Sequence, residues 1–242
     1  MAQMDWQNGV MAFDIQPDVG PEWSVVLAGD WAPLGDQVCA AIDHPQAFCG
    51  DLAPILQEAD LALVNVEGVL GSAGQPVTKD GPHLALLEAA AEALVAAPFH
   101  VACLANNHSM DYGPLGLVRT RERLARIGVA TVGAGQNAEE ACRPLVCRVQ
   151  GIRVAIVNAA EGEEGRSVNG GRGVADLDQD RLTRQVSALR HDAEVVIAVL
   201  HAGREFTPVP PPYLQRLCRT LVEAGADLVV GHHPHVPQGL EI

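Results

Sequence analysis

The chain has 242 residues, a formal net charge of −14, and 48% hydrophobic but only 4% aromatic residues. This length suffices for one large domain or two small ones, and the core of such a chain must be aliphatic. The acidic charge argues against a nucleic-acid-binding surface, because such a surface needs a basic patch.

Residues 1–22 predict a loosely ordered lead-in, because they hold glycine, proline and scattered polar residues. They contain no basic segment and no long apolar run, which argues against a signal peptide or a membrane anchor. We therefore expect a cytoplasmic protein with reduced thiols. In an oxidising compartment, Cys39 and Cys49 could instead bridge a loop.

Five apolar runs along the chain each end on residues that can bind a divalent metal ion. The runs are 24–29 before Asp30, 61–64 before Asn65 and Glu67, 101–105 before Asn106, Asn107 and His108, 195–200 before His201, and 228–231 before His232, His233 and His235. Short runs of this kind followed by helical stretches are typical of buried parallel strands. Ligands of open α/β sheets bind beyond the carboxyl ends of the strands. The pattern therefore predicts a metal-centred site.

Helical and turn signals alternate with these strands. Helices are predicted at 50–58, 83–97, 114–127, 182–189 and 213–224, a short strand at 129–132, and a hairpin at 145–149 and 152–157. Residues 158–176 are rich in glycine and predict a flexible loop. Arg166 and Arg172 in this loop could clamp an anionic group or remain solvated.

The chain shows no internal repeat and no clear linker, so residues 23–242 predict one α/β domain with mixed sheets. Residues 238–242 look like the beginning of a strand. A domain rarely ends on an unpaired strand, because the strand edge would be exposed. We therefore expect the C-terminal part of the domain to be incomplete.

The donor types favour particular metals. The oxygen donors of Asp30, Glu67 and Asn107, mixed with imidazoles, suit Mn, Fe or Zn better than Ca. Two such ions about 3.5–4 Å apart can clamp a phosphate and generate hydroxide near neutral pH, provided that one carboxylate bridges them. In the His233-Pro234-His235 turn, the two imidazoles could each reach a different ion. Of Asn107 and His108, one could bind metal while the other acts as a general acid.

One segment carries a family resemblance. Residues 104–113, Leu-Ala-Asn-Asn-His-Ser-Met-Asp-Tyr-Gly, resemble the A-N-N-H-x-x-D-Y-G block of the CapA/PgsA capsule-synthesis family, which acts in poly-γ-glutamate biosynthesis. Segments 29–30, 59–68, 133–135, 201–205 and 225–236 match the other blocks of the family in order. The resemblance spans residues 24–242. It implies a calcineurin-like metallophosphatase fold, a βαββ sandwich with a dinuclear metal centre at the strand ends.

The resemblance also implies a role for each matched residue. Asp30 and His235 would bind the first metal, and Glu67 would bridge the two ions. Asn107, His201 and His233 would bind the second metal. His108 would lie near the leaving group. We expect His108 and Asp111 to be the catalytic residues.

Three departures from the family pattern stand out. Ala32 occupies the place of the histidine in the metallophosphatase D-x-H signature, which predicts one tight metal and a second, weaker one. Ala202 replaces the usual tryptophan of the H-W-G-x-E block. The closing Y-S-L-G-N-F segment is missing, as expected for an incomplete C-terminus.

Several residues also allow simpler interpretations. His201 could be a hydrogen-bonded core histidine, and His232 is the weakest candidate ligand of its cluster. Glu205 could contact substrate or be a surface carboxylate. Asp111, with Tyr112, fits a role in fixing the loop after His108 better than a direct chemical role.

Two functions of different classes follow. The first is a metal-dependent hydrolase of the phosphoesterase type, which acts on an anionic small molecule or polymer in capsule metabolism. The second is a non-catalytic component of polymer biosynthesis that binds polyanion or metal. The lack of a membrane anchor in this chain favours the enzyme. An inactive, truncated fragment is a third possibility.

Overall fold

Two four-stranded sheets form the body of the structure, a computed structural model that describes residues 2–5, 10–13, 23–162, 171 and 173–242. The first sheet has the order β3-β4-β7-β8, and all its strands are parallel. Its strands are β3 (Val25–Trp31), β4 (Leu61–Val66), β7 (Val101–Cys103) and β8 (Ala130–Val132).

The second sheet has the order β10-β11-β13-β14. Its strands are β10 (Leu145–Val149), β11 (Ile152–Ala160), β13 (Val195–His201) and β14 (Leu228–His232). The β10–β11 hairpin is antiparallel, whereas β11, β13 and β14 are parallel. The five predicted strands that end on candidate ligands and the predicted hairpin are therefore confirmed, and so is the mixed α/β class.

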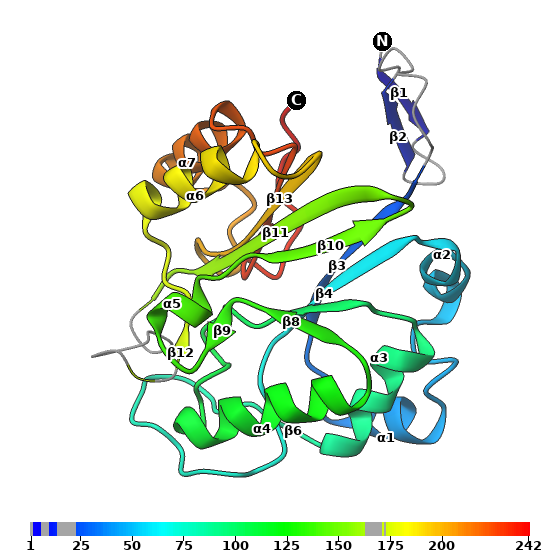
Figure 1. The fold of residues 1–242 in the computed structure, drawn as a ribbon. Coiled ribbons are helices and arrows are strands. Elements are labelled where there is room, and N and C mark those ends of the chain that lie inside the picture. Colours follow the sequence, from blue (N-terminus) through cyan, green and yellow to red (C-terminus); the bar gives the residue numbers. More distant parts are fainter. Residues whose placement is uncertain (1, 6–9, 14–22, 163–170, 172) are drawn as a thin grey trace.

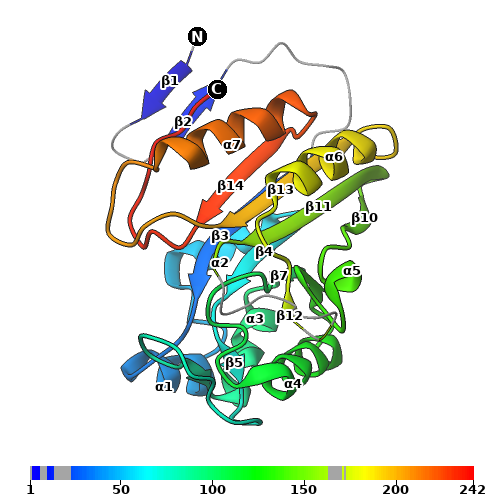
Figure 2. The same cartoon turned by 90° about the vertical axis from the view of Figure 1, so that its left-hand side faces the viewer.

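Helices cover the outer faces of the two sheets, which gives a four-layer sandwich (Figures 1 and 2). On the first sheet lie α1 (Asp36–Asp43), the 3₁₀ helix η1 (Gly50–Leu52), α2 (Ala53–Glu58), the 3₁₀ helix η2 (Glu88–Ala91), α3 (Glu92–Ala96) and α4 (Gly113–Arg126). On the second sheet lie α6 (Gln179–Leu189) and α7 (Pro212–Glu223). The sequence did not predict α1 or the short helix α5 (Ala138–Ala141).

The core follows from this layering. Leu63 and Val101 of the first sheet pack with Ile156 and Ile197 of the second sheet in the layer between them. A larger aliphatic cluster fills the space between the sheets and their helices. The core is aliphatic, as the low aromatic content predicts.

Three short strand pairs complete the topology. They are β5 (Val69–Leu70) with β6 (Ala85–Leu86), β9 (Ala134–Gly135) with β12 (Gly173–Val174), and β1 (Ala2–Asp5) with β2 (Val10–Phe13). The β1–β2 pair lies within the predicted lead-in, of which residues 1, 6–9 and 14–22 are outside the described residues. Arg166 and Arg172 also lie outside the described residues.

The predicted helix at 83–97 is wrong in its first third, because Ala85–Leu86 forms strand β6 and helical structure begins only at Glu88. The amide of Leu84 donates to Asp111 Oδ2 at 2.6 Å, which holds this segment in an extended form. A long-range hydrogen bond thus overrides the helical spacing of the leucines.

All six cysteines are free, so Cys39 and Cys49 do not bridge. No helix in the described part of the chain is long and apolar enough to cross a membrane.

Candidate metal centre

The carboxyl ends of strands from both sheets meet at one place. Asp30 follows a register shift in β3, and the amide of Glu67, just after β4, donates to the carbonyl of Trp31 at 3.1 Å. His201 ends β13 and pairs in register with His232 of β14. Because parallel strands present their ends to the same edge, the two sheets bring carboxylates and imidazoles together.

Among the described residues, three overlapping groups have donor atoms within 4.8 Å of one another. They are Glu67 with His201 and His233, Glu67 with Asp30 and His235, and Glu205 with His233 and His235. Asn107 joins the first group, since its Oδ1 atom lies 2.9 Å from His201 Nε2. All six predicted metal ligands therefore lie in one cluster, and Glu67 belongs to both of the groups that contain His201 or Asp30.

The chemistry of this cluster fits divalent metal ions. Glu67 and His201 are 2% and 1% exposed, and His233 Nδ1 is buried without a hydrogen-bond partner in the described part of the chain. A buried polar atom without a partner is costly unless something else satisfies it. Imidazole nitrogens and carboxylate oxygens are both common ligands of divalent metal ions.

The cluster also sets the protonation of its members. Burial, with the charges of Asp30 and Glu205, raises the pKa of Glu67 to about 8. Burial lowers the pKa of His201 to about 3 and also lowers the pKa of His233. The imidazoles of His201 and His233 are therefore neutral at neutral pH, which is the form that binds metals.

Asp30 behaves differently from Glu67. Burial alone would raise the pKa of Asp30, but the hydrogen bond with His232, the adjacent imidazoles and the hydrogen bond from Asn65 hold it well below its usual range. His232 Nδ1 lies 3.2 Å and His235 Nδ1 lies 3.3 Å from the carboxylate of Asp30. Asp30 is thus an ionised carboxylate among imidazoles, next to a protonated Glu67.

His108 stands at the margin of the cluster with its two ring nitrogens in different surroundings. Nε2 lies 3.9 Å from Glu67 Oε1, whereas Nδ1 lies 2.8 Å from Asp111 Oδ2. Burial would raise the pKa of Asp111, but hydrogen bonds from His108, Lys79 and Leu84 lower it. Asp111 is fully buried and holds the ring of His108, which agrees with a role in fixing the loop.

Buried amides support these residues. Asn65 Nδ2 donates to Asp30 Oδ1 at 2.7 Å and lies 3.3 Å from His201 Nδ1. Asn106 Oδ1 accepts from the backbone amide of His108 at 3.1 Å. The sequence placed both asparagines at strand ends, but it gave no indication of these supporting contacts.

The His233-Pro234-His235 turn has an unusual backbone. His233 and His235 have φ angles of 95° and 54°, in the left-handed region that non-glycine residues rarely adopt. The amide of Phe206 donates to the carbonyl of Pro234 at 2.8 Å and ties the turn to the loop that carries Glu205. The two imidazole centroids are 6.1 Å apart, and His233 belongs to the group with Glu67 and His201, whereas His235 belongs to the group with Asp30 and Glu67.

The sequence gives little indication of the contacts that two residues of this region make. His232, the weakest candidate ligand of its cluster, belongs to none of the three metal-binding groups among the described residues, but its Nδ1 atom lies 3.2 Å from Asp30 Oδ1. The sequence pattern indicates no role for Lys79, although its ammonium contacts Asp111 and lies 3.2 Å from His108 Nδ1. Its being the single lysine of the chain was the signal that could have drawn attention to it.

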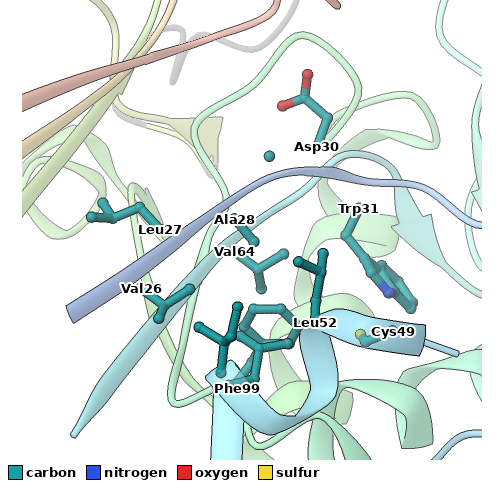
Figure 3. Close-up of a pocket in the computed structure, with 12 residues that line it drawn as sticks. Val26, Leu27, Ala28, Asp30, Trp31, Cys49, Leu52, Val64 and Phe99 are labelled. Carbon is teal, nitrogen blue, oxygen red and sulfur yellow. The ribbon is translucent and has the colours of Figure 1, made fainter. Parts of the chain in front are cut away.

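An apolar cavity of about 300 Å³ lies beside the cluster. Val26, Ala28, Leu52 and Phe99 line it, and the carboxylate of Asp30 points away from these side chains (Figure 3). Strand β3 therefore separates this cavity from the polar cluster.

Known proteins resemble the chain over most of its length. Residues 24–242 match the model of a protein family that is described as bacterial capsule synthesis protein PGA_cap. The capsule biosynthesis protein CapA of Bacillus anthracis is 32% identical over 66% of this chain and 40% of that protein. The PGA biosynthesis protein CapA of Bacillus subtilis (strain 168) is 31% identical over 60% of this chain and 39% of that protein. The matched region thus spans about two fifths of these relatives.

A crystal structure of a hypothetical protein from Thermus thermophilus is similar in fold. It superposes with a TM-score of 0.50 and 18% sequence identity, and covers 88% of this chain and 69% of that chain. At this identity the likeness concerns the fold alone.

Proposed function

The chain belongs to the bacterial capsule synthesis protein family PGA_cap, and from this premise we propose that its strand-end cluster is a dinuclear metal centre of a phosphoesterase-type hydrolase. The observation that carries the proposal is the position of Glu67, which is shared by two groups of metal-binding side chains. A single bridging carboxylate with separate ligands on either side is what a two-metal site requires.

The proposed ligand sets follow from these groups. Asp30, Glu67 and His235 would hold one ion, and Glu67, Asn107, His201 and His233 would hold the other. When bound, Mn, Fe or Zn would supply Lewis acidity and a nucleophile near neutral pH. Glu205 lies beside His233 and His235 and is exposed, so we assign it to substrate contact.

His108 supplies the proton in this proposal. Asp111 accepts from the Nδ1 side of the ring, which leaves Nε2 facing the cluster near Glu67. A proton held at Nε2 can pass to the oxygen of the leaving group, and Asp111 keeps the ring oriented as it does so.

The substrate class follows from the site and the relatives together. We propose an anionic small molecule or polymer of capsule metabolism, because the names of the two Bacillus relatives concern capsule and PGA biosynthesis. The net charge of −14 does not favour nucleic acid.

One observation favours a second candidate, a component that binds metal or polyanion without turnover. Ala32 stands where the D-x-H signature has its histidine, so the group with Asp30 and His235 has fewer protein ligands than its neighbour. An incompletely filled centre would bind substrate but turn it over poorly.

The test is metal-dependent hydrolysis. Protein stripped of metal and reloaded with Mn, Fe or Zn is assayed on a panel of phosphoesters and γ-glutamyl compounds. We expect hydrolysis in the reloaded protein only, and we expect His108→Ala to retain metal while losing turnover by about 10²–10⁴-fold. Bound metal with no turnover on any substrate would favour the second candidate, and equal loss of metal and turnover in His108→Ala would make His108 a ligand.

A further inference from the structure

Lys79 is the single lysine of the chain, and its side chain is buried. Its side chain is 3% exposed, within the loop between β5 and β6. Lysine is almost never fully buried unless it is paired, because removing an ammonium from water is costly. The proposed ligands and the proposed proton donor leave this residue without a role.

The contacts of Lys79 all involve one segment. Its ammonium donates to Asp111 Oδ1 and to the carbonyl oxygen of Asn107, the latter at 3.3 Å, and it lies 3.2 Å from His108 Nδ1. These three residues belong to the stretch after β7 that brings an amide and an imidazole to the cluster. Lys79 therefore contacts the segment that positions two site residues, Asn107 and His108.

The same loop is tied to Asp111 by its backbone as well. The amide of Val77 donates to the carbonyl of Asp111 at 2.9 Å, and the amide of Leu84 donates to Asp111 Oδ2 at 2.6 Å. His108 Nδ1 lies 2.8 Å from this same Oδ2 atom. Leu84 and His108 thus occupy Oδ2 of Asp111, whereas Lys79 donates to Oδ1. The ammonium of Lys79 supplies the positive charge that pairs with this buried carboxylate.

We propose that Lys79 is a positioning residue of the site. Its ammonium pairs with the buried carboxylate of Asp111 and holds the segment 107–111 so that the amide of Asn107 and the Nε2 atom of His108 face the metal-binding cluster. The consequence for metal binding rests on the proposed metal centre, and the consequence for turnover rests also on the proposed hydrolase activity.

The reason is the cost of an unpaired buried charge. Removing one partner of a buried ion pair leaves an uncompensated charge, which is far worse than removing both. In Lys79→Met, the Asp111 carboxylate and the Asn107 carbonyl both lose a donor, so the segment must move to recover one. In Lys79→Met/Asp111→Asn, the neutral amide no longer needs an ammonium.

The test compares Mn²⁺ binding by calorimetry in the native protein, the two single variants and the double variant. We expect Lys79→Met to weaken Mn²⁺ binding by about 10–100-fold, the usual effect of losing a residue that orients a ligand. The double variant should lose less than the product of the two single losses, because the two side chains act as a unit. Lys79→Arg, which keeps the charge, should recover most of the affinity.

Asp80→Asn is the matched control, because Asp80 is the exposed neighbour of Lys79 on the same loop. It should bind Mn²⁺ as the native protein does. Native affinity in folded Lys79→Met, or fully multiplicative losses in the double variant, would overturn the proposal.

A measurement on the native chain covers the case in which Lys79→Met fails to fold. Because the chain has one lysine, a pulse of amine acetylation followed by mass spectrometry of the peptide that contains Lys79 reports on this side chain separately from the N-terminal amine. We expect acetylation of Lys79 to be at least about tenfold slower in the folded than in the unfolded protein, and slower still with Mn²⁺ bound. Equally fast acetylation of Lys79 in both states would refute its buried pairing.

Turnover separates this proposal from the proposed function. If the native protein hydrolyses a substrate, Lys79→Met should lower kcat with little change in KM, and Lys79→Arg should restore kcat. If the native protein hydrolyses nothing, the hydrolase proposal fails, while Mn²⁺ binding and acetylation still decide the role of Lys79.

Discussion

At the scale of single residues, Glu67 has the most unusual electrostatics of the site. It is 2% exposed and lies near Asp30 and Glu205, and its pKa is raised to about 8. The metal-free protein therefore carries a proton on Glu67 at neutral pH. His201, whose pKa is lowered to about 3, carries none on its second nitrogen.

Metal binding should therefore release a proton from Glu67. The bound carboxylate is ionised, so between its ordinary pKa and pH 8 each binding event displaces about one proton. The apparent affinity should rise about tenfold per pH unit up to pH 8 and then level off. Calorimetry in buffers of different ionisation enthalpy measures this release. No proton release at pH 6.5 would contradict the protonated state of Glu67.

His233 combines two costs in the metal-free protein. Its φ is 95°, and its Nδ1 atom is buried without a hydrogen-bond partner among the described residues. Left-handed strain and an unpaired buried polar atom each cost about 1–3 kcal/mol. Such costs persist where a function needs the residue, and the proposed metal binding would need both the backbone turn and the free Nδ1 atom of His233.

His233→Asn should separate stability from metal binding. Asparagine adopts left-handed backbone angles more readily, so the metal-free variant should melt no lower than the metal-free native protein. The native protein should gain Tm when Mn²⁺ is added, and the variant should gain much less. Thermal unfolding with and without Mn²⁺ checks both statements. A large loss of Tm in the metal-free variant would show that His233 stabilises the fold instead.

The sequence predicted the candidate ligands but not their supports. Each ligand follows an apolar run or lies in a block of the family pattern, and both signals are local. Lys79 meets Asp111 across 32 residues, and Asn65 meets His201 across 136 residues. The spacing of residues along the sequence cannot indicate contacts over such separations, so only the folded structure shows them.

At the scale of elements, Asn158 joins the two sheets beside the cluster. On β11, its Oδ1 atom accepts from the amide of Ala105 at 2.7 Å, and its Nδ2 atom donates to the carbonyl of Val199 at 3.0 Å. Gly133, between β8 and β9, has a φ of 87° and leaves room for this side chain. A Cβ atom on Gly133 would lie 2.1 Å from Asn158 Oδ1 and 2.8 Å from the amide nitrogen of Ala105.

Gly133→Ala should therefore loosen the junction of the sheets. Left-handed strain and the steric clash together should lower the free energy of unfolding by about 2–5 kcal/mol. Mn²⁺ binding should weaken as well, because the two sheets carry different candidate ligands. Gly128→Ala is the control, because Gly128 has a φ of 81° but nothing within 4 Å of an added Cβ. It should lose only about 1–2 kcal/mol. Equal losses in urea unfolding would show that the approach of Asn158 to Gly133 does not matter.

The elements show where local patterns suffice. Strands β4, β7 and β13 are buried on both faces, and their continuous apolar runs predicted them well. The segment 83–97 has leucines at helical spacing, but its beginning pairs with β5 and bonds to Asp111. Because Asp111 lies 27 residues away in the sequence, the local spacing of the leucines could not indicate this contact, and it predicted a helix where the chain is extended.

At the scale of the whole molecule, the two sheets contribute different donors to one cluster. Asp30, Glu67 and Asn107 come from the ends of the first sheet, and His201, His233 and His235 come from the second. Bound metal ions would therefore link the two halves of the sandwich. The sequence predicted this convergence because it predicted parallel strands, whose ends share an edge.

Titration of Mn²⁺ into the metal-free protein, native and Glu67→Gln, measures the shared centre most directly. We expect two ions per native chain with unequal affinities, because the group with Asp30 and His235 has fewer protein ligands than the group with His201 and His233. Ala32→His should tighten the weaker site. Glu67→Gln should weaken both ions together, since one carboxylate serves both. Unchanged binding in Glu67→Gln would contradict a dinuclear centre bridged by Glu67, and two ions of equal affinity in the native protein would contradict the assignment of fewer ligands to the site with Asp30 and His235.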